Sequence, residues 1–324
     1  MVSSLDPALA EVWRGEYLEA VHHGSVAIVG PDGVRLALGS TTTPFLSRSA
    51  IKPIQAVAML RNGLDLTGPH LALAGASHDG EPIHVDGALT ILDGAGLSPA
   101  DLQNTPDFPS REPLTAWLAA GRDKETIAHN CSGKHSAMVR TCARAGWPLH
   151  SYRDPAHPLQ TAIRAELAAQ TGDNVGESVV DGCGAPAFPT TLEGLARAFG
   201  RIAGATDGPE KQLADAFRAH PEYASGTKRD EVVYHREVPG LICKAGAEGI
   251  LAIGLPDGTG IAVKISDGRH RATVPVAVAI LKSLGHSTPA LETLDPEPVL
   301  GHGEKVGHLA PSAALLEALD GSRI

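Results

Sequence analysis

The chain has 324 residues, 43% of them hydrophobic, which is the composition of a soluble globular protein large enough for one big domain or two fused layers. A net charge of −10 and an aromatic content of 4% argue against a surface for nucleic acids or anionic membranes. No apolar run approaches the roughly 20 residues that a membrane span needs, and the start MVSSLDPALAEVWRG does not resemble a signal peptide. We therefore expect a cytoplasmic protein whose four cysteines are reduced.

Two stretches predict β-hairpins, one near each end of the chain. Residues 25–39 (SVAIVGPDGVRLALG) and 249–268 (GILAIGLPDGTGIAVKISDG) each consist of apolar runs joined by a Pro-Asp-Gly turn. Segments with helical spacing of apolar residues, several of them ending at Gly, lie between the hairpins and once after them. These predicted helices cover residues 53–63, 81–96, 134–146, 157–172, 190–204, 209–220 and 273–285.

This order of elements favours an α+β fold. Strands at both ends with helices between them predict one antiparallel sheet, assembled from the two termini, with a helical insertion. We expect residues 1–63 and 236–324 to form the sheet subdomain and residues 64–235 to form a mainly helical one. A parallel βαβ array fits poorly, because strands and helices do not alternate.

The stretch RSAIKPIQA places a hydroxyl and an amine three residues apart, at Ser49 and Lys52. Ser49 suits a helix N-cap, and Pro53 would lie in the first turn, where a missing N–H is tolerated. A helix brings positions i and i+3 together, so Lys52 could activate the Ser49 hydroxyl. That role requires a neutral amine, made so by burial or by a second cation. The alternative is a capping serine followed by a solvated lysine.

A second cation is available at Lys244, in ICKAGAEG, where a K-x-G sequence adjoins a predicted strand. The alternative here is a lysine that protects an edge strand from pairing. An S-x-x-K sequence followed much later by K-x-G on a strand is the order found in penicillin-recognising serine enzymes. The two sequences together therefore indicate an acyl-enzyme mechanism in which Lys244 helps to keep Lys52 neutral.

Four motifs, RSAIKPIQA, ALAGASHDGE (72–81), HNCSGKHSAM (129–138) and DGCGAPAFP (181–189), resemble those of the L-asparaginase family of the Rhizobium etli type. The TGGT motif of the commoner bacterial asparaginases is absent from the sequence. The resemblance implies a serine β-lactamase-like and glutaminase-like fold, hydrolysis of L-asparagine to L-aspartate and ammonia, and a homodimer.

The resemblance also implies roles for individual residues. Two Ser-Lys pairs would be Ser49 with Lys52 and Ser77 with Lys244, with Ser49 as the nucleophile and Ser77 as the open alternative. Arg48 and Asp181 would meet the charged ends of the substrate. His135 is assigned to the pocket on its position alone, because it lies between the cysteine-lysine motif and the predicted helix. The implied zinc site would consist of Cys131, Lys134 and Cys183.

Other interpretations of these residues stay open. Lysine is an unusual zinc ligand, because it must lose a proton, and Cys131 with Lys134 also suits a helix start followed by a solvated lysine. A Cys131–Cys183 disulfide is disfavoured in a reducing compartment. Cys142 is expected to be a core thiol, and Lys264 to belong to strand structure. The rival functions are a related serine amidase, such as a glutaminase or a β-lactam or peptide amidase, and a catalytically dead zinc-binding scaffold.

Overall fold

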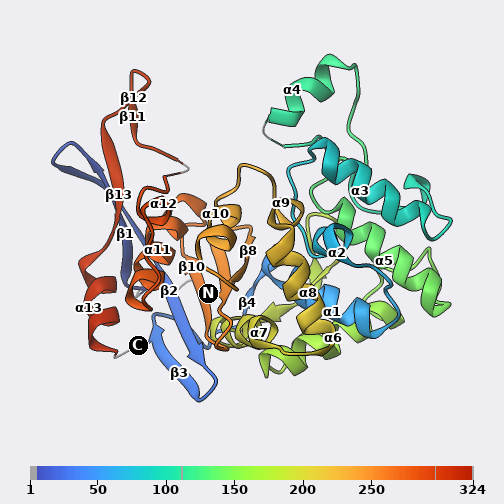
Figure 1. Cartoon of the computed structure of the whole chain (residues 1–324), viewed down its shortest axis with the longest axis horizontal. Coiled ribbons are helices and arrows are strands. Elements are labelled where there is room, and N and C mark those ends of the chain that lie inside the picture. The colour runs from blue at the N-terminus through green and yellow to red at the C-terminus, as the bar shows by residue number, and fades with distance from the viewer. Residues whose placement is uncertain (1–5, 111, 296, 323–324) are drawn as a thin grey trace. The chain divides into compact units, whose positions relative to one another are not determined.

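The computed structural model describes residues 6–110, 112–295 and 297–322 (Figure 1). The chain divides into two compact units, which we call the sheet unit and the helical unit. The sheet unit holds the described residues up to Ala50, Thr190–Gly204, and those from Val233 onward. The helical unit holds Ile51–Pro189 and Ala205–Val232.

This division differs from the expected one at two places. Helix α1 (Lys52–Arg61) belongs to the helical unit, because it packs mainly against other helices of that unit, among them α5 (Ser132–Ala145), α6 (Pro158–Thr171) and α8 (Gly208–Ala219). Helix α7 (Leu192–Gly204) belongs to the sheet unit, because it packs against strands of the sheet. Amphipathic spacing predicts that a helix exists but does not say which partner covers its apolar face.

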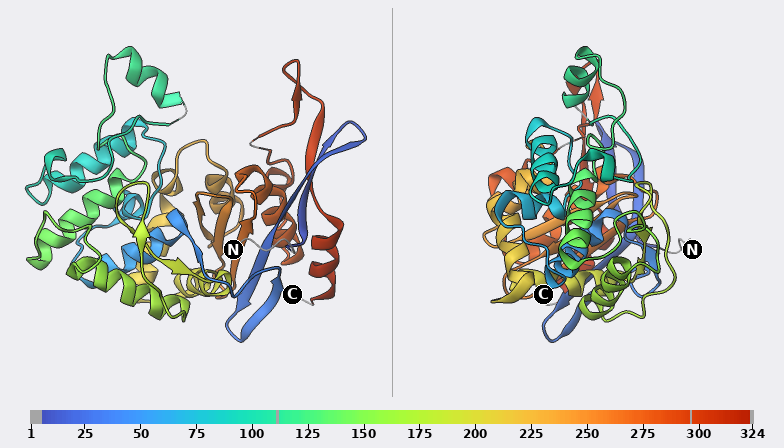
Figure 2. Two further views of the ribbon diagram at one scale, coloured as in Figure 1. Left: turned by 180° about the vertical axis from the view of Figure 1, so that it is seen from behind. Right: turned by 90° about the vertical axis from the view of Figure 1, so that its right-hand side faces the viewer.

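One antiparallel sheet organises the sheet unit. Its strands follow the order β13-β1-β2-β10-β9-β8, with β3 paired to β2. Both predicted hairpins are confirmed, as β2–β3 and β9–β10. The pairing of β1 with β13 joins segments from opposite ends of the chain, as expected, and the two strands run side by side in both views of Figure 2. The seven strands are β1 (Ala8–Arg14), β2 (Tyr17–Gly30), β3 (Gly33–Leu38), β8 (Ile242–Gly246), β9 (Ile250–Gly254), β10 (Gly260–Ile265) and β13 (Gly307–Pro311).

The two faces of this sheet are covered differently. Alternate residues of the strands, such as Leu251, Ile253 and Val263, share one hydrophobic core with α11 (Thr273–Ser283) and α13 (Ala313–Gly321). Helix α7 packs on the strands from the other side, where glycines permit a very close approach. A Cβ atom at Gly260 would lie 1.7 Å from the Ala196 carbonyl oxygen, and one at Gly254 would lie 2.1 Å from the Phe199 carbonyl oxygen.

The helical unit is formed by helices inserted between the two hairpins. Helix α2 packs against α8 and α5, and α3 packs against α5. All the helices predicted in this part of the chain are present. Besides those already given, the unit has α2 (Gly68–Ala74), α3 (Pro82–Asp93), α4 (Glu112–Ala119) and α9 (Pro221–Ala224).

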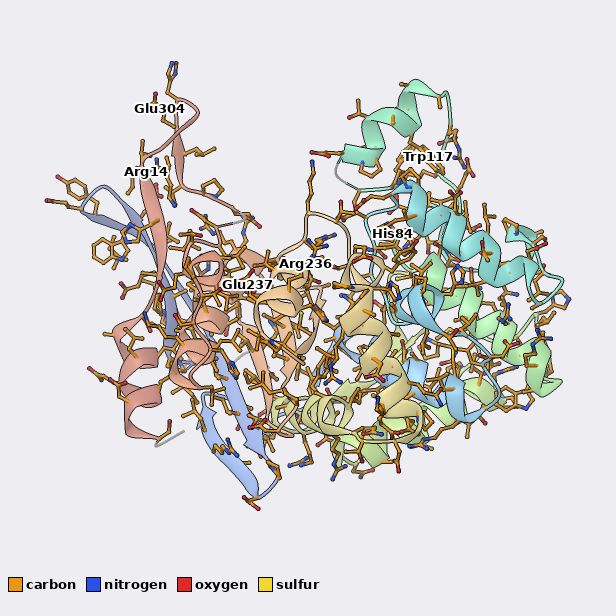
Figure 3. All side chains as sticks on the ribbon, viewed as in Figure 1. Arg14, His84, Trp117, Arg236, Glu237 and Glu304 are labelled. Carbon is orange, nitrogen blue, oxygen red and sulfur yellow. The ribbon has the colours of Figure 1, made fainter. Side chains whose placement is uncertain are left out.

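Short elements complete the described chain. In the sheet unit, Arg14 Nη1 donates to the Leu300 carbonyl oxygen (3.2 Å), and Arg14 and Glu304 lie toward the same end of the unit (Figure 3). None of the described helices combines the length and the apolar character that crossing a bilayer requires. The remaining elements are β4 (Phe45–Leu46), η1 (Arg48–Ile51), η2 (Pro99–Asp101), β5 (Val179–Val180), β6 (Pro186–Ala187), β7 (Pro189–Thr190), α10 (Asp230–Glu237), η3 (His270–Ala272), α12 (Pro289–Glu292), β11 (Leu300–Gly301) and β12 (Glu304–Lys305).

Candidate active site

Lys52 is the first residue of α1 and one of the most deeply buried charged side chains of the described residues, with 1% of its surface exposed. Its Nζ lies 2.7 Å from Ser77 Oγ, 2.7 Å from the Ala76 carbonyl oxygen and 3.0 Å from Cys131 Sγ. Burial lowers the pKa of Lys52, and the nearby Lys134 charge lowers it further, whereas Cys131 opposes the shift. The solvated-lysine interpretation is therefore wrong, because Lys52 is buried and burial makes its amine easier to deprotonate than a solvated one.

The start of α1 differs from the expected N-cap at Ser49. A 3₁₀ turn, η1, covers Arg48–Ile51, and Ile51 stands at the N-cap without a side-chain hydrogen bond. Pro53 does lie in the first turn, as expected. Arg48 has a φ of 49°, a left-handed conformation that a non-glycine residue seldom adopts, and such strain gathers at functional positions. Ser49 is thus half-buried in a strained turn and free of a capping role.

Lys244 projects from the face of β8 that is turned away from the hydrophobic core. Its neighbour Cys243 belongs to that core, and alternation along the strand sends Lys244 and Gly246 to the opposite face. A Cβ atom at Gly246 would lie 2.8 Å from the Ser47 carbonyl oxygen and 3.2 Å from the Ala50 nitrogen. The strand that carries Lys244 therefore packs against the turn that carries Ser49. Lys244 is 1% exposed, so it is not a solvated edge lysine.

Cys131, Cys183 and Lys134 come together in the helical unit. The two cysteines belong to one buried cluster, and Lys134 Nζ donates to Cys183 Sγ (3.2 Å). The hydrogen bond from Cys183, reinforced by the charges of Lys52 and Lys134, holds the pKa of Cys131 well below its usual value. Burial opposes a charge on Lys134, but Cys183, Cys131 and Asp181 outweigh it and raise the pKa of Lys134. Lys134 is 2% exposed, so it is no solvated lysine either.

Sulfur and nitrogen are donor types that zinc accepts, and the cluster offers two sulfur atoms and one nitrogen. The Cys131 thiol is readily ionised, as a zinc ligand must be, whereas the raised pKa of Lys134 opposes the loss of the proton that binding would require. Within the described ranges there is no group of three or more His, Cys, Asp and Glu side chains that could hold a metal ion. All four cysteines are free thiols, so Cys131 and Cys183 do not form a disulfide.

His135 and Asp181 border the same cluster. His135 follows Lys134 on α5 and is fully buried, and its Nδ1 lies 2.7 Å from the Tyr152 hydroxyl. Burial and the Lys134 charge lower the pKa of His135 to about 4, so the ring is neutral at physiological pH. Asp181 heads a tight turn in which its carbonyl oxygen accepts from the Gly184 N–H (2.8 Å), and this turn carries Cys183. Tyr152 was not predicted, because a lone tyrosine between helices carries no motif.

The predicted residues thus form two sets. The structure brings Lys52, Ser77, Cys131, Lys134, Cys183, His135 and Asp181 into the helical unit, and Arg48, Ser49 and Lys244 into the sheet unit. Cys142 is a buried core thiol, as expected, and burial raises its pKa to about 12. Lys264 lies in β10, where its Nζ donates to the Glu248 carbonyl oxygen (2.8 Å), as expected for a residue of strand structure.

Comparison with known proteins identifies the class of this site. The family model described as L-asparaginase II matches residues 10–311. This match covers most of the chain and places the protein among the amidohydrolases, which act on small molecules. The chain belongs to the L-asparaginase II family. No individual curated protein matches the sequence significantly.

Several solved structures are similar to the chain at low identity. A β-lactamase from Mycobacterium bovis is 16% identical, with a TM-score of 0.47 over 86% of this chain and 95% of that one. The native form of Mglu is 13% identical, with a TM-score of 0.44 over 78% of this chain, which spans only 59% of the length of Mglu. A Bacillus subtilis protein described as a probable glutaminase, complexed with 6-diazo-5-oxo-L-norleucine, is 14% identical, with a TM-score of 0.40 over 82% of this chain and 84% of that one.

Proposed function

We propose that the protein is an L-asparaginase that hydrolyses L-asparagine to L-aspartate and ammonia through a Ser-Lys acyl-enzyme. The observation that carries the proposal is the environment of Lys52, a buried amine with a lowered pKa, 2.7 Å from a serine hydroxyl, in a chain of the L-asparaginase II family. A neutral lysine beside a hydroxyl is the arrangement by which an enzyme activates serine without a histidine.

The contacts of Lys52 place its amine beside a group that can exchange a proton with it. Lys52 Nζ donates to the Ala76 carbonyl oxygen (2.7 Å), to Ser77 Oγ (2.7 Å) and to Cys131 Sγ (3.0 Å). A carbonyl oxygen can only accept, whereas the Ser77 hydroxyl can also donate once the amine has lost a proton. The direct contact therefore supports transfer of a proton between Lys52 and Ser77.

The proposed reaction runs in two halves. Ser49 Oγ attacks the side-chain amide carbon of asparagine while Lys52 takes the hydroxyl proton. Lys52 returns this proton through Ser77 to the departing nitrogen, which leaves as ammonia, and an ester joins the aspartyl group to Ser49. Water then attacks the ester, Lys52 again takes the proton, and aspartate leaves with Ser49 restored. Lys244 supplies positive charge on the strand that packs against the Ser49 turn.

Asparagine has a carboxylate and an ammonium group, and the proposal gives each a partner of opposite charge. Arg48 is assigned to the carboxylate and Asp181 to the ammonium group. His135, neutral and buried beside Lys134, is assigned to the pocket wall.

The proposal includes one zinc ion at Cys131, Cys183 and Lys134. When bound, zinc would add positive charge beside the pocket and help to orient the substrate. The cysteines would bind as thiolates. Lys134, whose raised pKa means that its amine is otherwise protonated, would bind after losing a proton. Zinc uptake should accordingly release protons, which a weakly buffered titration detects.

The proposed protein is a homodimer, as the family resemblance implies, and the cytoplasm is its proposed compartment. Free thiols at all four cysteines are the state that a reducing compartment maintains. Light scattering of the purified protein, which gives its mass directly, tests the dimer.

Ammonia release from L-asparagine by the purified protein is the test of the function. L-glutamine, a β-lactam and a dipeptide amide serve as parallel substrates. A pocket discriminates one methylene by only about 1–3 kcal/mol, so slow glutamine hydrolysis is compatible with the proposal. Preference for another of these substrates would replace asparaginase by a related serine amidase. Lack of turnover on all of them, with zinc bound, would identify a zinc-binding scaffold.

The nucleophile is assigned by comparing Ser49→Ala with Ser77→Ala. If Ser49 attacks, mass spectrometry of the quenched wild-type reaction finds the aspartyl adduct on the peptide that contains Ser49, and Ser49→Ala forms no adduct. Ser77→Ala should still form the adduct, more slowly. An adduct on Ser77 would reverse the two roles, an arrangement that the direct Lys52–Ser77 contact would also permit.

A further inference from the structure

The loop that carries Ser77 is held in place by backbone hydrogen bonds on two sides. It lies between α2 and α3, and three consecutive N–H groups donate to residues outside it. The Ser77 N–H donates to the Ala224 carbonyl oxygen (3.3 Å), and the Asp79 N–H donates to that of Ser225 (3.0 Å). The His78 N–H donates to the Asn130 carbonyl oxygen (3.0 Å), beside Cys131. The position of Ser77 therefore depends on the segment around residue 225.

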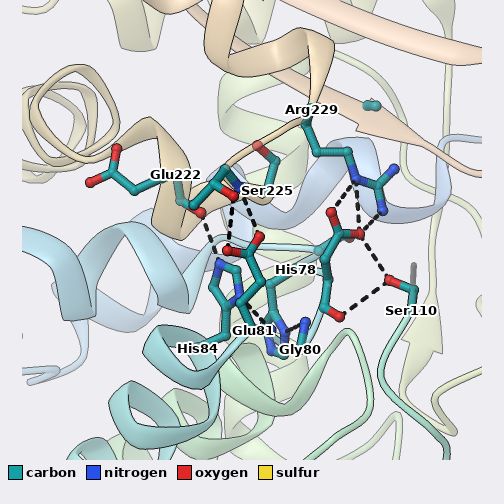
Figure 4. A network of polar contacts seen from close by, with 12 residues as sticks. His78, Gly80, Glu81, His84, Ser110, Glu222, Ser225 and Arg229 are labelled. Carbon is teal, nitrogen blue, oxygen red and sulfur yellow. Dashed lines mark hydrogen bonds and ion pairs between the residues drawn. The ribbon is translucent and has the colours of Figure 1, made fainter. Parts of the chain in front are cut away.

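A buried ion pair fixes this loop to the same segment. The Asp79 side chain is almost wholly buried. Arg229 Nε donates to both of its oxygens, at 3.0 and 3.1 Å, and Arg229 Nη2 donates to Oδ1 at 2.5 Å. Ser110 Oγ also donates to Asp79 (2.8 Å), and the dashed lines in Figure 4 show Arg229 and Ser110 converging on the carboxylate. A bidentate guanidinium fixes the orientation of a carboxylate as well as its position.

The packing around this pair leaves little space for movement. A Cβ atom at Gly226 would lie 2.3 Å from Asp79 Oδ2, so the backbone passes directly beside the carboxylate. Two residues after Asp79, the Glu81 carboxylate accepts from the N–H (2.8 Å) and the hydroxyl (2.9 Å) of Thr227. Both acidic residues of the SHDGE sequence therefore hold the segment 224–229.

Two neutral histidines, His78 in the loop and His84 in α3, link the loop to neighbouring segments by hydrogen bonds. His78 Nδ1 accepts from the Gly80 N–H (3.1 Å), which leaves Nε2–H to donate to Ser132 Oγ (3.0 Å). His84 Nδ1 accepts from the Glu81 N–H (3.0 Å), and Nε2 donates to the Glu222 carbonyl oxygen (2.8 Å). Figure 4 shows His84 reaching Glu222. Burial lowers the pKa of both histidines, so neither supplies the charge that fixes the loop.

We propose that Asp79 and Arg229 are positioning residues that set the distance between the Ser77 hydroxyl and the Lys52 amine. The inference rests on the proposed function, in which Ser77 passes a proton to the leaving ammonia. Asp79 is two residues after Ser77, and Arg229 is the last residue of the segment 224–229 that the loop contacts. Release of the ion pair would thus lengthen the 2.7 Å Lys52–Ser77 contact.

Energetics favour positioning over stability as the role of the pair. A buried ion pair contributes little more to stability than apolar residues of similar volume would. An error of about 1 Å in the placement of a reacting group, in contrast, can reduce the rate about 100-fold. Because Ser77 acts in the chemical step, the effect of misplacement should appear in kcat.

Asp79→Asn and Arg229→Lys are the test variants. We expect kcat for asparagine to fall about 10- to 100-fold, with KM within about twofold of the wild-type value. Asp65→Asn is the matched control, because Asp65 accepts from Arg140 Nε (2.6 Å) in the same unit without contact to the Ser77 loop. The control should keep kcat. A kcat unchanged in both test variants, or equally reduced in the control, would overturn the proposal.

A double-mutant cycle with Ser77→Ala separates positioning of Ser77 from a general structural effect. If the ion pair acts through Ser77, adding Asp79→Asn to Ser77→Ala should change kcat by less than about twofold. The same loss in both backgrounds would show that Asp79 acts through other groups.

Amide hydrogen exchange tests the positioning without any substrate. In Asp79→Asn and Arg229→Lys, the peptide covering residues 76–81 should exchange about tenfold faster than in wild type, and in Asp65→Asn it should not. Because exchange is measured without substrate, its result does not depend on whether the protein releases ammonia from asparagine. Failure of the proposed function can therefore be told apart from failure of the positioning role. Unchanged exchange in both test variants would refute the positioning role.

Discussion

Lys52→Arg tests whether the buried amine acts as a base. An unperturbed lysine with a pKa of about 10.4 would be neutral in about one molecule in 2,500 at pH 7, a penalty of about 4.6 kcal/mol. Lys52 is 1% exposed, and its burial reduces this penalty by lowering the pKa. Arginine keeps the charge but does not give up its proton in a protein. We therefore expect kcat to fall by about 100- to 10,000-fold, the usual contribution of general base catalysis.

The assay is ammonia release at saturating asparagine between pH 6 and 10. Wild-type kcat should rise with pH and level off well below the pKa of a free lysine, because deprotonation of Lys52 creates the active base. Lys282→Met is the control, since Lys282 is an exposed lysine paired with Glu292. Lys52→Met repeats the test with an uncharged side chain in case the larger arginine disturbs the fold. More than about a tenth of wild-type kcat in both Lys52 variants would refute the reasoning.

The same shift predicts how stability depends on pH. Burial in the folded state holds the pKa of Lys52 below the 10.5 of a solvated lysine, so the unfolded chain binds the extra proton at intermediate pH. The contribution of Lys52 to the free energy of unfolding should therefore rise with pH through the window between the folded-state pKa and 10.5. The urea midpoint of wild type minus that of Lys52→Met should accordingly increase from pH 7 to pH 10. A difference that is constant with pH would contradict the lowered pKa.

Three further predictions concern the metal cluster, the core and the sheet. Cys183→Ser should lower the zinc content, measured by elemental analysis, and should raise KM. The kcat at saturating asparagine should stay within about threefold of wild type, because Ser49 and not a metal-bound hydroxide attacks. Abolished kcat would assign zinc a larger role. Cys142→Ala should lose about 1–2 kcal/mol in urea unfolding with unchanged kcat, because Cys142 is fully buried in α5; loss of activity without loss of stability would contradict a core role. Gly260→Ala should cost about 3 kcal/mol or more, because the added Cβ atom would lie 1.7 Å from the Ala196 carbonyl oxygen; a stability equal to that of wild type would show that α7 can move away.

Local sequence was sufficient to predict most of the secondary structure. The Pro-Asp-Gly turns located both hairpins, because only a few residues supply the dihedral angles of such turns. The 3.6-residue spacing located α1, α3, α5, α6, α7, α8 and α11, but not the short α2, in which the motif at residues 72–81 begins. Strands β1 and β13 were not predicted, because each is short and partly exposed and is stabilised by pairing in the folded sheet, β13 with β1 and β1 with both β13 and β2.

The family was also readable from the sequence. Ser49, Lys52, Ser77, Cys131, Lys134 and Cys183 lie in the four motifs that resemble one family, and the family match from residue 10 to 311 confirms that resemblance. Motifs of this kind are local, because a catalytic side chain needs a particular backbone conformation immediately around it. The predicted roles of these residues as nucleophile, base and metal ligand stay predictions.

Tertiary structure decided what each of these side chains contacts. From the sequence, Lys52 was paired with Ser49, three residues away. In the structure its amine also donates hydrogen bonds to Ser77, Ala76 and Cys131, which come from distant parts of the chain. Cys131 and Cys183 are 52 residues apart and still share one buried cluster. Burial, which separates a base from a solvated lysine, depends on all the elements that surround the side chain. A sequence states which groups are present, but the pKa of Lys52 is fixed only when the folded chain removes water from around its amine.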